Sequence, residues 1–399
     1  MNRDLTVRSP HRAIPLWRDV RVLRILAQLA FLLLVVAVSA FLYHNLTTAL
    51  TRRGLSGGFG FLKLEAGFDI GEGIPYKPSD SYGRAFWVGV VNTLTVSAWG
   101  IVLATVLGVV VGVARLSSNW LVNRITQVYI EVMRNTPLLV QLFFWYFVGM
   151  VQGPSIQESL KLPGPIYVSN RGVAMGWLFP TASYRPWSWA LLGGLLLAVG
   201  VYLLLRRLEI RSGPLSYPFL MAVATLGVIA AVGWLAVWLA TGQSPLVKQD
   251  PVLQRFNFVG GRILSPEFAA LLVGLVTYTG AFIAEVVRGG ILAVHKGQQE
   301  AARALGLTHL QTLQLVIFPQ AMRVIIPPLI SQYLNLTKNS SLAVAIGYPD
   351  LYSVGGTIYN QTGRPLPVLV LIMGSYLAMS LITSLVMNIY NRRVQFIQR

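Results

Sequence analysis

The sequence predicts an all-α fold, a polytopic transmembrane helical bundle of about eight spans with both termini in the cytoplasm. Of the 399 residues, 54% are hydrophobic and only 12% are charged, and the mean hydropathy is +0.61. A soluble domain carries about 25% charged residues. Apolar runs of about 20 residues, the length that crosses a bilayer, recur along the chain. These observations exclude a soluble protein and a single-span anchor.

Eight apolar runs bounded by charged or turn residues are the expected spans. They cover residues 25–43, 86–114, 121–150, 187–205, 217–240, 267–287, 322–346 and 366–390. With the N-terminus inside, the cytoplasmic segments hold 20 of the 32 Lys and Arg residues, as the positive-inside rule requires. The net charge of +18 is therefore attributed to topology, and no nucleic acid partner is expected.

The spans and the polar segments between them divide the chain into five regions. These are a cytoplasmic basic tail (1–24), a first span with an external loop (25–85), a core with spans two and three (86–150), an external loop with two inserted spans (151–265), and a core with spans six to eight (266–399). The last region includes a cytoplasmic loop at about 289–320.

Small residues mark one face of the second span. Ala104, Gly108 and Gly112 follow one another at four-residue spacing. Residues at this spacing share a helix face, and small side chains there let two helices approach closely. The face is predicted to pack against another helix.

Ionisable residues within the spans need partners because lipid does not solvate them. Glu131 and Arg134 lie three residues apart and can pair, either as a structural pair near the cytoplasmic side or as a functional charged site. Glu285 is expected to reach the headgroups beside Arg288. Pro137 is expected to kink the third span and to free backbone groups that can line a cavity.

Residues 287–319 are too polar to span the membrane and too periodic for a loop. Good helix formers run from Glu300 to Leu305, Gly306 can end that helix, and an amphipathic segment follows from His309 to Phe318. Two short cytoplasmic helices that meet at a glycine could insert into a partner and transmit its motion to the spans. The alternative is an amphipathic linker that lies on the lipid surface.

A family resemblance is carried by the run Gly297-Gln298-Gln299-Glu300-Ala301-Ala302-Arg303-Ala304-Leu305-Gly306, followed by Val316-Ile317-Phe318-Pro319. It resembles the EAA loop of ABC importer permeases, with Val316 and Phe318 as conservative departures. In that family the loop is a coupling helix that docks into the ATP-binding subunit. The resemblance implies docking positions at Glu300, Ala301, Ala302, Gly306 and Pro319.

Two further stretches, 129–141 and 338–342, resemble the branch of these permeases that carries polar amino acids. The inserted spans and the external run 58–68 are similar to the larger permease subunits of general L-amino acid importers. The resemblance implies a multi-pass protein of the bacterial inner membrane with a type I importer core. It also implies L-amino acid import, polar and of broad specificity.

The same resemblance implies the partners. They are a second, related permease that forms a heterodimer, two copies of an ATP-binding subunit, a periplasmic amino acid binding protein and membrane lipid. No phosphate-binding loop occurs in the sequence, so ATP and Mg²⁺ are assigned to the ATPase and no cofactor, catalytic residue or metal site to this chain. The alternatives are an ion-coupled secondary transporter and a structural membrane subunit.

A zwitterionic substrate needs partners for a carboxylate and an ammonium group in a medium that makes unpaired charge costly. The expected substrate path therefore consists of polar side chains within the spans, namely Gln141, Thr277, Thr279, Asn335, Lys338, Asn339 and Ser340. Asn335, Lys338 and Asn339 would share one helical face. The alternative is that this face packs against the partner permease.

Overall fold

A computed structural model describes residues 20–52, 58–212 and 217–394. The predicted basic tail lies outside the described residues up to position 19. The helices are α1 (Val20–Arg52), α2 (Tyr82–Ala114), α3 (Trp120–Asn135), α4 (Leu138–Phe143), α5 (Tyr184–Ser212), α6 (Pro218–Thr241), α7 (Pro266–Leu292), α8 (Lys296–Ala304), α9 (His309–Thr312), α10 (Phe318–Asn339), α11 (Leu351–Thr362) and α12 (Pro365–Val394). Shorter helical segments are the 3₁₀ turns η1 (Gly60–Lys63) and η4 (Ser340–Ile346) and the π-helical η2 (Phe144–Val151) and η3 (Leu313–Ile317).

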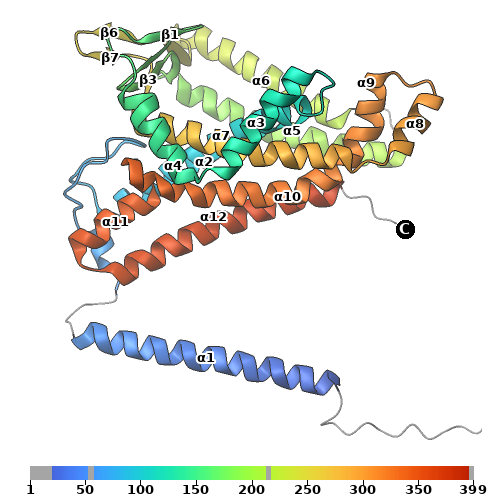
Figure 1. Cartoon of the computed structure of the whole chain (residues 1–399). Coiled ribbons are helices and arrows are strands. Elements are labelled where there is room, and N and C mark those ends of the chain that lie inside the picture. The colour runs from blue at the N-terminus through green and yellow to red at the C-terminus, as the bar shows by residue number, and fades with distance from the viewer. Residues whose placement is uncertain (1–19, 53–57, 213–216, 395–399) are drawn as a thin grey trace, which may run out of the picture.

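The long helices form a bundle whose two ends differ (Figure 1). One end carries the strands and α11, and the other carries α8 and α9. Helices α2 and α7 pack against each other at the centre, α10 packs against α7, and α12 packs against α10. By the distribution of Lys and Arg, the end with α8 and α9 is cytoplasmic and the end with the strands is external.

The contact between α2 and α7 depends on the small residues of α2. A Cβ atom on Gly108 would lie 2.5 Å from Ile283 Cγ2, and one on Gly112 would lie 2.6 Å from the carbonyl oxygen of Ala284. Ala104 is fully buried. Because only a residue without a Cβ fits at such distances, the predicted packing face is confirmed.

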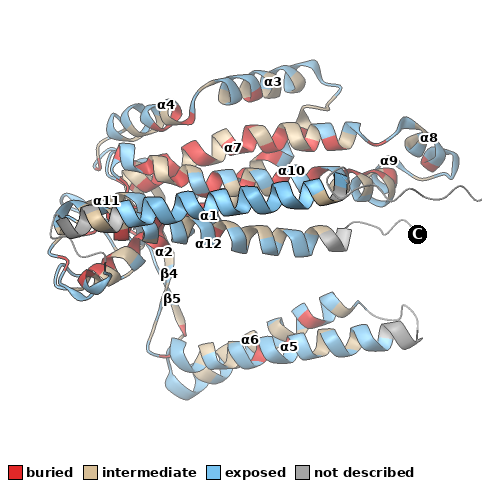
Figure 2. Ribbon diagram, turned by 90° about the horizontal axis from the view of Figure 1, so that it is seen from below, coloured by how far each residue is buried: buried red, intermediate tan, exposed pale blue. Residues whose placement is uncertain are grey.

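Seven described helices are long and apolar enough to cross a membrane, against eight expected spans. The difference lies in the third expected span, 121–150, which is not one helix. Helix α3 ends at Asn135, and a shorter apolar segment covers Leu138–Val151. Figure 2 shows α3 and α4 in succession along one edge of the bundle. This passage is made in two pieces.

Pro137 breaks this passage instead of kinking it. The residue before a proline avoids the helical conformation, and Thr136 is extended with φ −98° and ψ 129°. Pro137 itself has φ −56° and ψ 136°. Gln141 Nε2 donates to the carbonyl oxygens of Met133 at 2.8 Å and Thr136 at 3.0 Å. The Gln141 side chain thus satisfies carbonyl groups at the end of α3 that lack helical partners.

Short strands cover the external end, in a region expected to form loops. They are β1 (Leu160–Leu162), β2 (Ile166–Ser169), β3 (Gly172–Met175), β4 (Trp177–Pro180), β5 (Leu246–Gln249), β6 (Val252–Gln254), β7 (Asn257–Val259) and β8 (Arg262–Leu264). An antiparallel sheet has the order β1-β2-β3-β8, and β4–β5 and β6–β7 form two separate pairs. Strands of three or four residues are too short for an alternating pattern to predict them.

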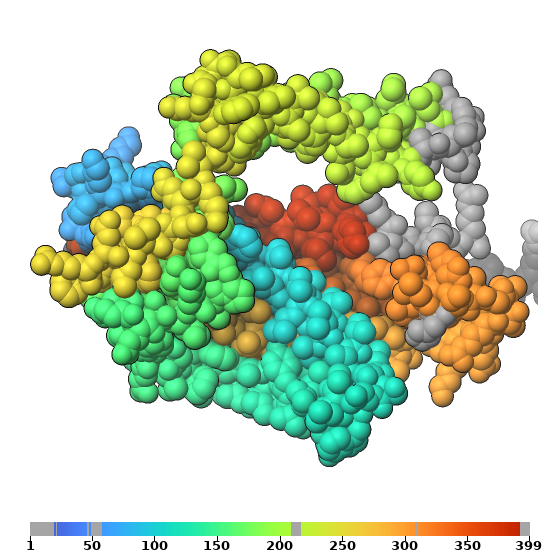
Figure 3. Space-filling model, turned by 90° about the horizontal axis from the view of Figure 1, so that it is seen from above, coloured from blue at the N-terminus to red at the C-terminus, as the bar shows by residue number. Residues whose placement is uncertain are grey.

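Helices α5 and α6, the two inserted spans, form a hairpin that stands apart from the bundle (Figure 2). They pack against each other, and the antiparallel β4–β5 pair links them to the rest. Figure 3 shows open space between this hairpin and the bundle. Helix α1 is likewise exposed along its apolar length, from Leu23 to Tyr43.

Candidate functional site

The two predicted short cytoplasmic helices that meet at Gly306 are present, and we call this segment from α8 to η3 (296–317) the elbow. Helix α8 ends at Ala304, and the chain reverses through Gly306, which has φ +78°. This left-handed conformation favours glycine because a side chain there strains the backbone. The N–H of Leu307 donates to the carbonyl of Ala302 at 3.1 Å and closes the turn. His295 caps the other end of α8, where its Nδ1 accepts the N–H of Gly297 at 3.2 Å.

The elbow presents most of its predicted docking positions to solvent. Glu300, Ala301, Gly306 and Pro319 are exposed. Ala302 is only 3% exposed, because α8 packs back against α9 and η3. Ala302 holds the elbow together in this arrangement, and its contact with a partner stays a prediction. Docking at the four exposed positions stays a prediction.

Leu305, at the end of α8, is a candidate docking position that the sequence reasoning missed. Its side chain is 81% exposed beside the turn, and Leu310 and Leu315 are also exposed on the following segment. Large apolar side chains gathered on a cytoplasmic projection mark a surface for another protein. The amphipathic pattern of 309–318 was the available signal, and the exposed apolar surface also includes Leu305 at the end of the preceding helix.

The second arm of the elbow continues into the membrane. Segments α9, η3 and α10 follow one another without a break, and the stretch Leu310–Ile346 is apolar enough to span. Gln320 Nε2 at the base of α10 donates to Gln298 Oε1 of α8 at 3.2 Å. The elbow and α10 are therefore joined both through the chain and by this hydrogen bond.

Part of the predicted path lies on an open face of α10. Asn335 and Lys338 are exposed and Asn339 is half-buried, and α10 is a regular helix up to Asn339. The prediction that these three side chains share a face is confirmed. Lipid does not tolerate such groups, so this face requires a protein partner or an aqueous path. Ser340, in contrast, is fully buried and donates to the carbonyl of Thr337 at 2.8 Å.

Three further residues predicted for the path are engaged within the bundle. Thr277 Oγ1 donates to the carbonyl of Val273 at 2.8 Å, and Thr279 is buried. Gln141 is 5% exposed, and its amide nitrogen holds the break before α4. Only its Oε1 has no hydrogen-bond partner among the described residues. These three residues belong to α4 and α7, and none of them is exposed as Asn335 and Lys338 are.

The predicted Glu131–Arg134 pair is not formed among the described residues. Glu131 accepts a hydrogen bond from Gln127 Nε2 at 2.7 Å, and the Arg134 guanidinium lies 5.2 Å from the centre of the Phe282 ring. A side chain one turn earlier on α3 thus satisfies the carboxylate, and an aromatic face on α7 attracts the cation.

The expected contact between Glu285 and Arg288 is present on α7. Arg288 Nε donates to Glu285 Oε2 at 3.0 Å, and both side chains are about one-third exposed. This pair lies near the cytoplasmic end of α7, where a partly exposed ion pair reaches the headgroup region.

A buried polar cluster ties the external end together, and the sequence reasoning did not assign it. Asn92 Nδ2 on α2 donates to the carbonyl of Pro349 at 2.9 Å and to that of Glu72 at 3.2 Å. Thr93 Oγ1 accepts the N–H of Leu351 at 3.0 Å. The polar pair 92–93 within an apolar run was the available signal. These bonds hold the start of α11 and the external loop against α2.

Asp350 is a fully buried carboxyl group in this cluster. It caps α11, where Oδ1 accepts the N–H of Ser353 at 2.8 Å, and Oδ2 accepts the hydroxyl of Tyr376 at 3.1 Å. Burial raises the pKa of Asp350 to about 6, although these hydrogen bonds favour the charged form. Burial also raises the pKa of Glu72. The polar cluster at the external end therefore includes two carboxyl groups, Asp350 and Glu72, whose charged forms are disfavoured by burial.

Comparisons with known proteins agree over almost the whole chain. A family described as the inner membrane component of binding-protein-dependent transport systems matches residues 256–396. The chain is 45% identical to the putative amino-acid ABC transporter permease protein YhdX of Escherichia coli, covering 94% of both chains. It is 43% identical to the general L-amino acid transport system permease protein AapQ of Rhizobium johnstonii, covering 89% of this chain and 88% of the relative.

A third relative has a name that specifies four amino acids. It is the glutamate/glutamine/aspartate/asparagine transport system permease protein BztB of Rhodobacter capsulatus, and the chain is 39% identical to it over 96% of both chains.

Proposed function

The chain belongs to the family of amino-acid ABC transporter permeases, and from this premise we propose that it moves L-amino acids, polar and of broad range, from the periplasm to the cytoplasm. It is a multi-pass protein of the inner membrane. The names of three relatives that match nearly its full length support the substrate class.

The assembly that we propose contains four kinds of subunit. ATP-binding subunits and a permease partner are general features of ABC importers. We infer two copies of the ATPase on the elbow, a second and related permease beside the open face of α10, and a periplasmic binding protein at the external end. ATP and Mg²⁺ bind to the ATPase, which carries out the hydrolysis.

The observation that carries this proposal is the continuity between the elbow and α10. The exposed elbow leads without interruption into the helix whose open face holds Asn335 and Lys338. Helix α10 is continuous from Phe318 to Asn339 although Pro327 and Pro328 lie inside it, and a continuous helix can pass a displacement from one end to the other. Closure of the ATPase pair around the elbow would therefore shift the polar face.

The polar cluster at the external end supplies the opposing gate. Its hydrogen bonds join α2, α11 and the loop at Glu72, which closes this end. Movement of α10 relative to α2 would open it, and the path would then be accessible to a substrate delivered from outside. Asn335, Lys338 and Asn339 offer a cation and two amides to the substrate carboxylate and ammonium groups.

The coupling role of the elbow can be tested at Gly306 in the reconstituted transporter. Gly306→Val places a β-branched residue at φ +78°, with a strain of about 1 kcal/mol or more. We expect severalfold lower uptake and lower substrate-stimulated ATPase activity, with normal membrane insertion. Gly306→Asn should retain most activity because asparagine tolerates this conformation.

Gly242→Val is the matched control, since Gly242 has φ +68° at the external end of α6 and open space around it. It should leave coupling intact. Normal substrate-stimulated ATPase activity in Gly306→Val would refute coupling through the elbow, and uptake that needs no ATPase would support a secondary transporter.

The path assignment is tested by Asn335→Ala. Loss of one amide from the open face should change the substrate preference or weaken apparent affinity about tenfold to a hundredfold, because a lost hydrogen bond to a charged group contributes roughly 1.5–3 kcal/mol. The subunits should still co-purify. Loss of the partner permease with unchanged selectivity of the residual uptake would identify this face as a subunit interface.

A further inference from the structure

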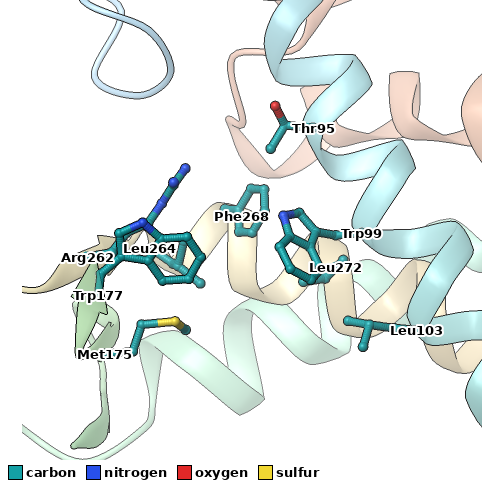
Figure 4. Close-up of a pocket in the computed structure, with 9 residues that line it drawn as sticks. All are labelled: Thr95, Trp99, Leu103, Met175, Trp177, Arg262, Leu264, Phe268 and Leu272. Atoms are coloured by element: carbon teal, nitrogen blue, oxygen red, sulfur yellow. The ribbon is translucent and has the colours of Figure 1, made fainter. Parts of the chain in front are cut away.

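An apolar cavity of about 200 Å³ lies where α2, α7 and the external sheet meet. Figure 4 shows Trp177 and Arg262 along one side, Trp99 and Leu103 along the other, and Phe268 between them. Trp177 begins β4, the strand that leads to the α5–α6 hairpin. The cavity therefore lies at the foot of the link between the bundle and the hairpin.

The walls continue down α2 as an apolar stripe. Trp99, Val102, Val106, Val110 and Val113 recur at three- and four-residue spacing and are all about half exposed. This spacing places them on one face of the helix. In a membrane, such a surface is covered by acyl chains or by another protein. The open space beside the hairpin in Figure 3 admits acyl chains next to the bundle.

Arg262 supplies a charge at the rim of the cavity. Its guanidinium lies 5.2 Å from the centre of the Trp177 ring and has no hydrogen bond or ion pair with any other described residue. Glu72 is close enough to attract this cation electrostatically, but neither nearby carboxylate forms an ion pair with it, since Glu72 accepts from Ser265 and Glu267 accepts from Tyr146. Arg262 is left with donors suited to an external phosphate.

The depth of the cavity matches the boundary between headgroups and acyl chains. Trp99 and Trp177 have the amphipathic rings that gather at this level. Arg262 belongs to the external sheet, whereas Leu272 on the opposite side lies within the span formed by α7. A ligand with a phosphate near Arg262 and an apolar chain near Leu272 would match both ends of the cavity.

We propose that this cavity binds one glycerophospholipid of the outer leaflet, with its phosphate on Arg262 and an acyl chain between Trp99 and Trp177. The bound lipid fills the foot of the space between the bundle and the hairpin. Phosphatidylglycerol fits best, because its headgroup carries no ammonium group to oppose the guanidinium. This site is separate from the elbow and from the face of α10, so the proposal does not depend on the substrate.

The test uses the complete transporter purified in detergent and titrated with dioleoyl phosphatidylglycerol, with bound lipid counted by native mass spectrometry. Arg262→Gln should weaken the tightest binding about fivefold, the effect of one basic residue at a membrane surface. Leu103→Trp should remove this binding by filling the cavity. Arg255→Gln is the matched control, because Arg255 lies in the turn between β6 and β7 and loses the same charge.

A phosphatidylglycerol with a photoreactive acyl chain locates the site. Crosslinks to peptides of α2 and of β3–β4 would support the proposal. Equal lipid binding in Arg262→Gln and Arg255→Gln would overturn it, as would crosslinks that map elsewhere. Lipid crosslinks confined to the partner permease would likewise overturn it, because they would show that the lipid does not occupy this cavity. Uptake measured on the same samples reports on transport separately.

Discussion

At the scale of single residues, the chemistry of Asp350 depends on burial and on hydrogen bonds from two helices. Its carboxylate accepts hydrogen bonds from the N–H of Ser353 on α11 and from the hydroxyl of Tyr376 on α12. Burial raises its pKa from 3.8 to about 6. The folded protein therefore holds this proton more tightly than the unfolded chain. The resulting stabilisation is fully present below pH 3.8 and is lost as the pH rises through about 6.

We expect Asp350→Asn to flatten the pH dependence of stability. The wild type should lose roughly 1–3 kcal/mol from this group between pH 4 and pH 7, whereas asparagine keeps the helix cap and does not titrate. Melting temperatures of the purified transporter across this range provide the measurement. The raised pKa of Glu72 affects the pH dependence of stability equally in the wild type and in Asp350→Asn. The difference between their two curves therefore reports on Asp350. Parallel curves would contradict the assigned burial effect.

Residue identity alone predicted some roles and missed others. Gly306 was recognisable because a glycine after a run of helix formers ends a helix, and its φ of +78° agrees. Gln141 was assigned to the path because it is polar within an apolar run. Its hydrogen bonds to Met133 and Thr136 depend on the break at Pro137, and the sequence pattern does not reveal what a buried amide contacts.

At the scale of elements, the close approach of α2 and α7 makes a sharp prediction. Gly108→Leu inserts a side chain where even a Cβ atom lies 2.5 Å from Ile283. We expect destabilisation of about 1–3 kcal/mol or a failure to assemble. Gly193→Leu on α5 is the matched control, since nothing lies within 4 Å of its Cβ position. The yield of folded transporter and its melting temperature measure both, and equal values would contradict the packing argument.

The positions of elements were predicted better than their continuity. Apolar length is a strong signal, and seven of the eight expected spans correspond to long helices, two before the third passage and five after it. An apolar composition does not reveal a break in the backbone. The sequence therefore predicted one span over 121–150, although the backbone is extended at Thr136. The external strands are three or four residues long, and their pairing across the inserted hairpin is a long-range property.

At the scale of the whole molecule, the assignment of the two ends can be tested by chemical labelling. The chain has no cysteine, so single cysteines report without background. Phe256→Cys, between β6 and β7, should react with an impermeant reagent added to intact cells from which the outer membrane has been removed. Leu305→Cys should react only in inverted vesicles. Both side chains are well exposed, at 63% and 81%, and the opposite pattern would reverse the topology.

The β4–β5 pair has a consequence for how such a chain can change over evolutionary time. Pro180 and Leu246 face each other in its register, so the points where the chain leaves and re-enters the external sheet are neighbours. Everything between them could be gained, lost or exchanged as one piece, and a tight turn could rejoin the two strands. The bundle helices would keep their registers. The hairpin is thus attached as a single unit, and its removal or exchange would leave the connections within the bundle unchanged.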